Sequence, residues 1–181
     1  MLELKNITKI YQSNQTRALD NISLSFREKE FVAIVGPSGC GKTTMLNIIG
    51  GIDNYSNGEL MINGVKTSNY KESHWDKYRN KSIGFVFQNY NLIPHLNVFE
   101  NIEMALILSG YKKHKRKEMV DNVLKQVSLT EVAKSMPNQL SGGQMQRVAI
   151  ARAIIKNPDI VLADEPTGAL YSKTATEIIA I

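Results

Sequence analysis

Residues 36–43 form a glycine-rich turn whose residue types and spacing suit phosphate binding. The run Gly-Pro-Ser-Gly-Cys-Gly-Lys-Thr fits the pattern G-x-x-x-x-G-K-[ST] at every fixed position. Its glycines let successive backbone N–H groups converge on phosphate oxygens at the positive end of a following helix. A chance glycine-rich turn is the alternative, but a strand-like run precedes these residues and a helix-like run follows them, as the motif requires. The residues that we expect to bind the nucleotide are Gly36, Ser38, Gly39, Cys40, Gly41, Lys42, Thr43 and Thr44.

Within this motif, two side chains have a specific chemistry. The ammonium of Lys42 can reach the β- and γ-phosphates of a nucleoside triphosphate, and the hydroxyl of Thr43 can bind Mg²⁺. The sequence therefore predicts a site for a triphosphate and its metal ion.

Two adjacent carboxylates, Asp164 and Glu165, follow the apolar run at 160–163. At the carboxyl end of a strand beside the phosphate loop, Asp164 can hold Mg²⁺ directly or through water. Glu165 lies on the other side of the alternating backbone, where it can face an attacking water molecule. Alone, such a pair would be interpreted as an ordinary acidic strand end. With the phosphate loop upstream, a hydrolytic site is the better interpretation.

A third motif is the run Leu-Ser-Gly-Gly-Gln at 140–144, and a fourth is Gln88, which follows the apolar run 84–87. With these four motifs in this order and spacing, the chain resembles the ATP-binding subunit of an ABC transporter over essentially its whole length. The resemblance implies an α/β fold: a P-loop NTPase core of the ABC type, with a mixed sheet, flanking helices and N-terminal antiparallel strands, plus a helical subdomain. It also implies ATP and Mg²⁺ as cofactors.

The resemblance assigns further roles residue by residue. Glu165 is implied as the general base, Gln88 and Lys42 as its catalytic partners, and Thr43, Gln88 and Asp164 as Mg²⁺ ligands. Tyr11 matches an aromatic residue that stacks on adenine; a tyrosine that only packs on the core remains the alternative. The signature residues are implied to bind the nucleotide of a second subunit in trans, although a capped helix start would also explain their types. These residues are Ser141, Gly142, Gly143 and Gln144.

The resemblance also implies partners and a location. We expect a head-to-tail homodimer with ATP at the interface, bound to an integral-membrane permease on the cytoplasmic side of the cell membrane. The residues 87–94 and 165–170 are similar to the branch of macrolide exporters, lipoprotein-releasing transporters and antimicrobial-peptide transporters. That branch suggests a peptide, lipid-linked or antibiotic-like cargo. Alternatives are a nucleotide-binding module with impaired hydrolysis and a soluble ABC ATPase that acts outside transport.

Two features depart from the family pattern. Tyr171 follows Gly168-Ala169-Leu170 where the family has an aspartate that couples the two nucleotide sites. The chain ends at Ile181, and no histidine lies beyond His114 to contact the γ-phosphate. We therefore expect a C-terminally truncated domain that hydrolyses ATP poorly in this form.

Apolar periodicity predicts the elements that must position these motifs. We expect one domain over 1–181, with a core at 1–88 and 139–181 and a helical subdomain at about 89–138. In the run 30–35, every residue from Phe31 to Val35 is apolar, so the run predicts a central strand buried on both faces. The remaining strands are predicted at 2–10, 18–26, 58–64, 83–88 and 159–163, and helices at 43–49, within 97–132 and at 144–156.

Composition and charge exclude several classes of protein. The chain has 181 residues, is 43% hydrophobic and 22% charged, and carries a net charge of +5 from 22 basic and 17 acidic residues. Five of the cations lie within 112–117, as many as the whole net excess, so a nucleic-acid partner is not predicted. A single cysteine, Cys40, excludes an internal disulfide and a cysteine-cluster zinc site. No apolar run is long enough to cross a bilayer, and we expect a cytosolic chain without a secretory signal.

Overall fold

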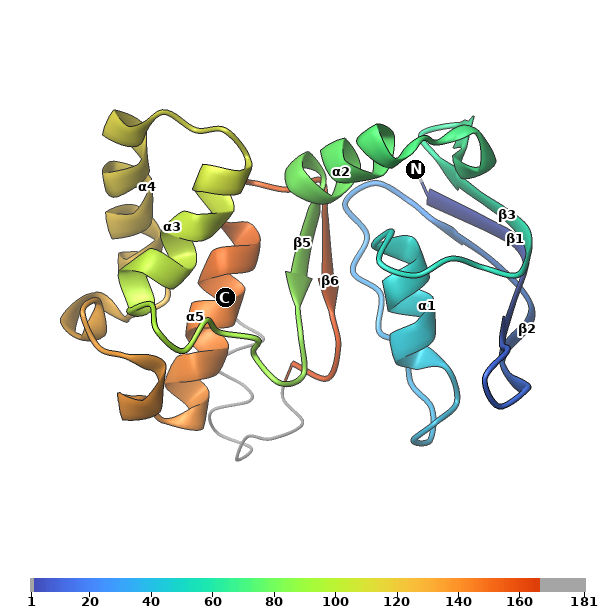
Figure 1. The fold of residues 1–181 in the computed structure, drawn as a ribbon, viewed down its shortest axis with the longest axis horizontal. Coiled ribbons are helices and arrows are strands. Elements are labelled where there is room, and N and C mark those ends of the chain that lie inside the picture. Colours follow the sequence, from blue (N-terminus) through green and yellow to red (C-terminus); the bar gives the residue numbers. More distant parts are fainter. Residues whose placement is uncertain (1, 167–181) are drawn as a thin grey trace. The chain divides into compact units, whose positions relative to one another are not determined.

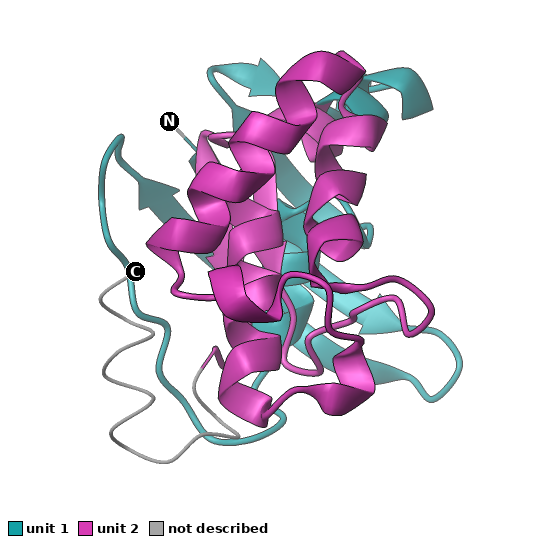
Figure 2. Ribbon diagram, turned by 90° about the vertical axis from the view of Figure 1, so that its left-hand side faces the viewer, with its two compact units in different colours: residues 1–77 teal, residues 78–181 magenta. Residues whose placement is uncertain are grey.

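Strands occupy most of the first part of the chain and helices most of the second in the computed structural model, which describes residues 2–166. The chain divides into two compact units between Lys77 and Tyr78 (Figure 2). The helix α2, Glu72–Lys81, crosses this division. Both units combine strands with helices, so the α/β class predicted from the sequence is confirmed.

The first unit is built on an antiparallel sheet. Its strands β1 (Leu2–Tyr11), β2 (Thr16–Phe26), β3 (Asn57–Ile62) and β4 (Val65–Lys66) are ordered β2-β1-β3-β4 (Figure 1). The helix α1, Lys42–Ile49, belongs to the same unit and buries Met45, Leu46, Ile48 and Ile49. Alternating apolar residues on the strands and one apolar face on the helix supply the core of this unit.

A shift of register within β1 decides which of its side chains are buried. Leu2 and Leu4 are buried and pair with Phe26 and Leu24 of β2. The pairing slips after Leu4, so the buried register continues at Ile7 and Lys9. As a consequence, a lysine lies on the inner face of the strand, two residues before Tyr11 at the strand end.

The predicted central strand at 30–35 is wrong for this structure. Residues 27–41 run as turns and irregular chain between β2 and α1 (Figure 1), and Phe31 and Val35 are 87% and 92% exposed. A continuous apolar run is buried as a strand only where neighbouring strands pair with it on both edges. In the sheet of the first unit, β1 to β4 occupy every position, and none of them pairs with this run.

The second unit contains a two-stranded parallel sheet and, among its described residues, three α-helices that lie wholly within it (Figure 1). The strands β5 (Ile83–Val86) and β6 (Ile160–Ala163) pair in register from Ile83–Ile160 to Val86–Ala163. The helices are α3 (Val98–Leu108), α4 (Lys113–Gln126) and α5 (Gly142–Ile154). A methyl group on Gly84 of β5 would lie 2.5 Å from the carbonyl oxygen of Ala153, so glycine lets α5 approach the strand closely.

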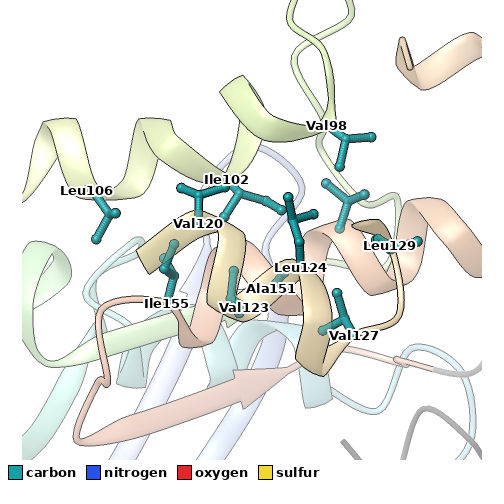
Figure 3. Close-up of a cluster of buried hydrophobic side chains, with 11 residues drawn as sticks. Val98, Ile102, Leu106, Val120, Val123, Leu124, Val127, Leu129, Ala151 and Ile155 are labelled. Carbon is teal, nitrogen blue, oxygen red and sulfur yellow. The ribbon is translucent and has the colours of Figure 1, made fainter. Parts of the chain in front are cut away.

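The three helices share one apolar cluster. Side chains from α3, α4 and α5 and from the turns that follow α4 and α5 converge there (Figure 3). On α3 the spacing Val98, Ile102, Leu106 places one apolar residue per turn on the same face. The helix starts with a capping box, in which Asn97 and Glu100 satisfy each other's backbone N–H groups. The remaining members of the cluster are Val120, Val123, Leu124, Val127, Leu129, Val148, Ala151 and Ile155.

Apart from 30–35, every predicted strand and helix is confirmed, with ends shifted by a few residues. The helix α2 was not predicted from the sequence, because only Trp75 and Tyr78 are apolar among its ten residues. Within 89–138 the described elements are all helical, but the assignment of this segment to a helical subdomain stays a prediction. Among residues 2–166, none of the helices is both long and apolar enough to cross a membrane.

We predict that Ile102→Ala destabilises the second unit, because Ile102 is fully buried among the three helices. The free energy of unfolding should fall by about 2–5 kcal/mol, from lost apolar burial and the cavity left behind. Urea denaturation followed by far-UV circular dichroism measures this change. Leu108→Ala is the matched control on the same helix, because Leu108 is 66% exposed. Equal effects of the two substitutions would contradict this core.

Candidate functional site

The phosphate loop ends in a glycine that no other residue could replace without strain. Gly41 caps α1 with φ 94° and ψ 7°, in the left-handed region. A methyl group at this position would lie 2.4 Å from the carbonyl oxygen of Ala18 in β2. The chain can therefore turn from the loop into α1 only where this side chain is absent. The turn places the N-terminus of α1, with its partial positive charge, directly after the loop.

The side chain of Lys42 folds back over this loop. Its ammonium donates hydrogen bonds to the carbonyl oxygens of Gly36 at 2.9 Å and Pro37 at 3.0 Å, and lies 4.0 Å from Sγ of Cys40. Among residues 2–166 no carboxylate neutralises it. A full positive charge held only by neutral carbonyls can exchange them for anionic phosphate oxygens, which bind an ammonium more strongly.

Tyr11 and Thr44 are brought together although they are 33 residues apart. The Tyr11 hydroxyl lies 3.4 Å from Oγ1 of Thr44 and donates a hydrogen bond of 3.0 Å to Oδ2 of Asp53. Thr44 belongs to the first turn of α1, so the tyrosine at the end of β1 is tied to the helix that carries Lys42.

A buried lysine and Asp53 extend this network. Lys9 is 9% exposed, and its ammonium donates to Oδ1 of Asp53 and to the carbonyl oxygen of Asn54, both at 2.6 Å. The same ammonium lies 4.8 Å from the centre of the Tyr11 ring. Partial burial raises the pKa of the Asp53 carboxyl, but the hydrogen bonds from Lys9, the Asn54 N–H and Tyr11 outweigh it, and the net pKa is lowered.

In the second unit, the parallel strands β5 and β6 bring Gln88 and Glu165 together. Because Val86 pairs with Ala163, the residues that follow both strands meet at one edge of the sheet. Nε2 of Gln88 donates a 2.9 Å hydrogen bond to Oε2 of Glu165. Glu165 has φ 47°, an uncommon value for a side chain of this kind. Such a conformation persists where the surroundings hold it, often at functional sites.

Asp164 and the signature residues occupy two further positions in the second unit. The N–H of Asp164 donates to the carbonyl oxygen of Val86 at 2.9 Å, and the residue is 7% exposed. Ser141 caps α5: its N–H bonds Oε1 of Gln144 at 2.8 Å, and its Oγ accepts the N–H of Gln144 at 3.3 Å. Gly142 and Gly143 form the first turn of that helix. The capped helix start anticipated from the sequence is therefore confirmed.

Two side chains that the sequence analysis missed hold the segment after Gln88. Arg152 of α5 donates to the carbonyl oxygens of Asn91 at 2.6 Å and Tyr90 at 2.7 Å. Both of these residues have positive φ, 59° for Tyr90 and 49° for Asn91. Burial lowers the pKa of Arg152, but a guanidinium remains charged at neutral pH.

The other missed residue is Asn101, buried on α3. Its amide nitrogen donates to the carbonyl oxygens of Ile93, Leu96 and Asn97, and its oxygen accepts the N–H of Ile93. It fixes the chain that leads from Gln88 into α3. A polar residue one position before Ile102, on the face that buries Val98, was the signal for it in the sequence.

The predicted site residues are divided between the two units. Tyr11 and residues 36–44 belong to the first unit, and Gln88, Ser141–Gln144, Asp164 and Glu165 belong to the second. Residues 168–171, including Tyr171, lie outside the described residues. Across residues 2–166, no three His, Cys, Asp or Glu side chains gather as a metal cluster would require.

Comparison with known proteins gives a family match over most of the chain. A family model described as ABC transporter matches residues 19–168. The chain is 50% identical to an uncharacterised ABC transporter ATP-binding protein, MJ0796, of Methanocaldococcus jannaschii, over all of this chain and 80% of that protein. It is 41% identical to the macrolide export ATP-binding/permease protein MacB of Hyphomonas neptunium, over 99% of this chain and 28% of MacB.

A solved structure is similar over the same range. The ATP-binding cassette MJ0796, described as a dimer in a post-hydrolysis state bound to ADP and Pi, aligns with a TM-score of 0.91 and 47% identity. The alignment covers 99% of this chain and 80% of that one. At this level of identity the likeness extends to the fold, and the predicted P-loop ABC-type α/β core is confirmed.

We predict that Arg152→Met loosens the segment after Gln88. The variant loses two charge-assisted hydrogen bonds, worth about 1.5–3 kcal/mol each, that stabilise consecutive left-handed residues. Hydrogen–deuterium exchange of the backbone amides in 87–93 should accelerate by at least about tenfold. Arg17→Met is the control, because the ion pair of Arg17 with Asp20 is exposed. Unchanged exchange in 87–93 would show that Arg152 does not hold this segment.

Proposed function

This chain belongs to the ABC transporter family, and we propose that it binds ATP with Mg²⁺ through residues 36–44 and hydrolyses it to drive a membrane permease. The observation that carries this proposal is the phosphate loop: a glycine-capped turn into α1, with the Lys42 ammonium resting on carbonyl oxygens of its own loop. This arrangement combines backbone N–H groups, a helix N-terminus and an exchangeable cation, which together suit a triphosphate.

The family resemblance, and not a contact between the two units, is the basis on which oxygen atoms of Thr43, Asp164 and Gln88 are proposed as Mg²⁺ ligands. Hydroxyl, carboxylate and amide oxygens are the donors that this ion prefers, and the low exposure of Asp164 limits competition from water. The bond to Glu165 uses the nitrogen of the Gln88 amide, so the carbonyl oxygen of that amide is the atom proposed as a ligand. When bound, the ion neutralises charge on the β- and γ-phosphates.

Glu165 acts as the general base in this proposal. It accepts a proton from the water that attacks the γ-phosphorus, while the hydrogen bond from Gln88 orients its carboxylate. Lys42 stabilises the negative charge that the γ-phosphate oxygens carry in the transition state. The products are ADP and phosphate, the two ligands named for the related MJ0796 cassette.

The signature residues complete the site of a second copy. In the capping box, the Ser141 hydroxyl lies at the N-terminus of α5. The N–H groups and the helix dipole at this end favour an anion. Offered in trans by a head-to-tail partner, Ser141, Gly142, Gly143 and Gln144 bind the γ-phosphate of the opposite nucleotide. The related MJ0796 cassette is described as dimeric, which supports this arrangement.

The partner at the membrane is an integral permease, and the chain binds it peripherally from the cytoplasmic side. Similarity to the ATP-binding part of MacB, in which a permease is fused to the ATPase, supports this assignment. It also favours the branch of exporters over a soluble ABC ATPase that acts outside transport. A module that binds ATP without hydrolysis is the other alternative, and Glu165 argues against it.

The phosphate-loop assignment predicts that Lys42→Ala weakens binding of Mg-ATP at least tenfold. The variant loses the only side-chain cation that the loop itself provides; tenfold corresponds to about 1.4 kcal/mol. Isothermal titration calorimetry with Mg-ATP measures the change, and Lys125→Ala on α4 is the control. A folded Lys42→Ala protein with unchanged affinity would refute the assignment.

The role of Glu165 predicts a separation of binding from chemistry. In the full-length protein, Glu165→Gln should bind Mg-ATP with little change, yet hydrolyse it at least about a hundredfold more slowly, because amides do not accept the water proton. The variant should also accumulate as an ATP-bound dimer. Phosphate release and size-exclusion chromatography with light scattering measure both effects. Turnover near the parent rate would exclude Glu165 as the base.

A further inference from the structure

We propose that Lys9 and Asp53 form a positioning pair that fixes the ring of Tyr11 for stacking on the adenine of ATP. This inference rests on the nucleotide site proposed above and assigns it two residues that none of its motifs contains. Every contact it uses lies within the first unit.

The Tyr11 ring is held at its hydroxyl and against one face. The hydroxyl donates to Oδ2 of Asp53 and contacts Oγ1 of Thr44, and the ammonium of Lys9 lies 4.8 Å from the ring centre. The Asp53 carboxylate thus binds the Lys9 ammonium through one oxygen and the Tyr11 hydroxyl through the other. With the ring fixed in this way, a base that stacks on it does not bear the entropic cost of ordering a free side chain.

The buried position of Lys9 argues that its charge has a use. Its neighbours on the inner face of β1 are Leu4 and Ile7, and an apolar side chain at residue 9 would continue that face without desolvating an ammonium. The ammonium is instead satisfied by Asp53 and the carbonyl oxygen of Asn54 at 2.6 Å each. What it adds beyond these bonds is a cation against the π face of Tyr11.

The geometry also links the adenine site to the phosphate site. The Lys9 ammonium lies against one face of the Tyr11 ring, so the adenine stacks on the opposite face. Thr44, which the Tyr11 hydroxyl contacts, lies two residues after Lys42 in α1. We infer that Lys9 and Asp53 affect the adenosine part of the affinity, whereas Lys42 affects the triphosphate part.

The test compares two ligands, Mg-ATP and Mg-bound inorganic triphosphate, by calorimetry on the full-length protein. Base stacking should make ATP bind roughly tenfold or more tightly than triphosphate in the parent. Lys9→Met should reduce this ratio by about threefold to fivefold, the size expected of a partly desolvated cation–π contact. Asp53→Asn should reduce it as well, Lys9→Arg should largely restore it, and triphosphate binding should stay unchanged. Lys5→Met is the control, because Lys5 lies on the same strand with an exposed side chain paired to Glu3.

A double-mutant cycle separates positioning from general stability. In a Tyr11→Ala background, Lys9→Met should have no further effect on the ratio, because the ring it positions is gone. The inference is overturned if Lys9→Met keeps the parent ratio, if it weakens both ligands equally, or if its effect persists without Tyr11. Failure of the proposed function is a different result: the parent would bind neither ligand. If Lys9→Met does not fold, Asp53→Asn gives the same comparison, and Lys9→Arg is the conservative variant that should keep the parent ratio.

Discussion

The absence of a side chain at Gly41 is the constraint on which the proposed nucleotide site depends. The loop must turn into α1 with a left-handed residue, and a methyl group there would overlap the carbonyl oxygen of Ala18. Because the turn is possible, α1 begins at Lys42 and its N-terminus directly follows the loop. Lys42, Thr43 and Thr44 then form the first turn of that helix. In this account Lys42 binds the phosphates, Thr43 binds the metal ion, and Thr44 contacts Tyr11.

In the second unit, residues beside the proposed site also have left-handed backbone conformations, and the neighbouring strands and helix hold them in place. Two parallel strands end in register, so Gln88 and Glu165 meet at one sheet edge, with Glu165 in the left-handed region. The chain after Gln88 passes through Tyr90 and Asn91, both left-handed, and Arg152 binds their carbonyl oxygens. Arg152 lies on the helix that Ser141 caps, so one rigid element carries the signature and the clamp on the segment after Gln88.

Local patterns in the sequence were enough to predict most strands and helices and to locate the four motifs. Each motif is a short run whose chemistry depends on neighbouring residues, as in residues 36–43 and 140–144. The strand at 30–35 was predicted wrongly because pairing partners, and not apolarity alone, make a strand. Lys9 and Asp53 were missed because they are 44 residues apart and only the fold joins them. The one local sign of this pair was the position of Lys9, two residues after Ile7 on the inner face of β1. It was not recognised because the pairing shifts register after Leu4.

The central claim is that the Lys42 ammonium exchanges its own loop carbonyls for the phosphates of ATP. A crystal structure of the full-length protein with Mg²⁺ and a slowly hydrolysed ATP analogue tests it most directly. We predict that the ammonium leaves the carbonyl oxygens of Gly36 and Pro37 and binds β- and γ-phosphate oxygens, at the N-terminus of α1. An analogue bound elsewhere, or a Lys42 that stays on both carbonyl oxygens with the analogue in place, would contradict it.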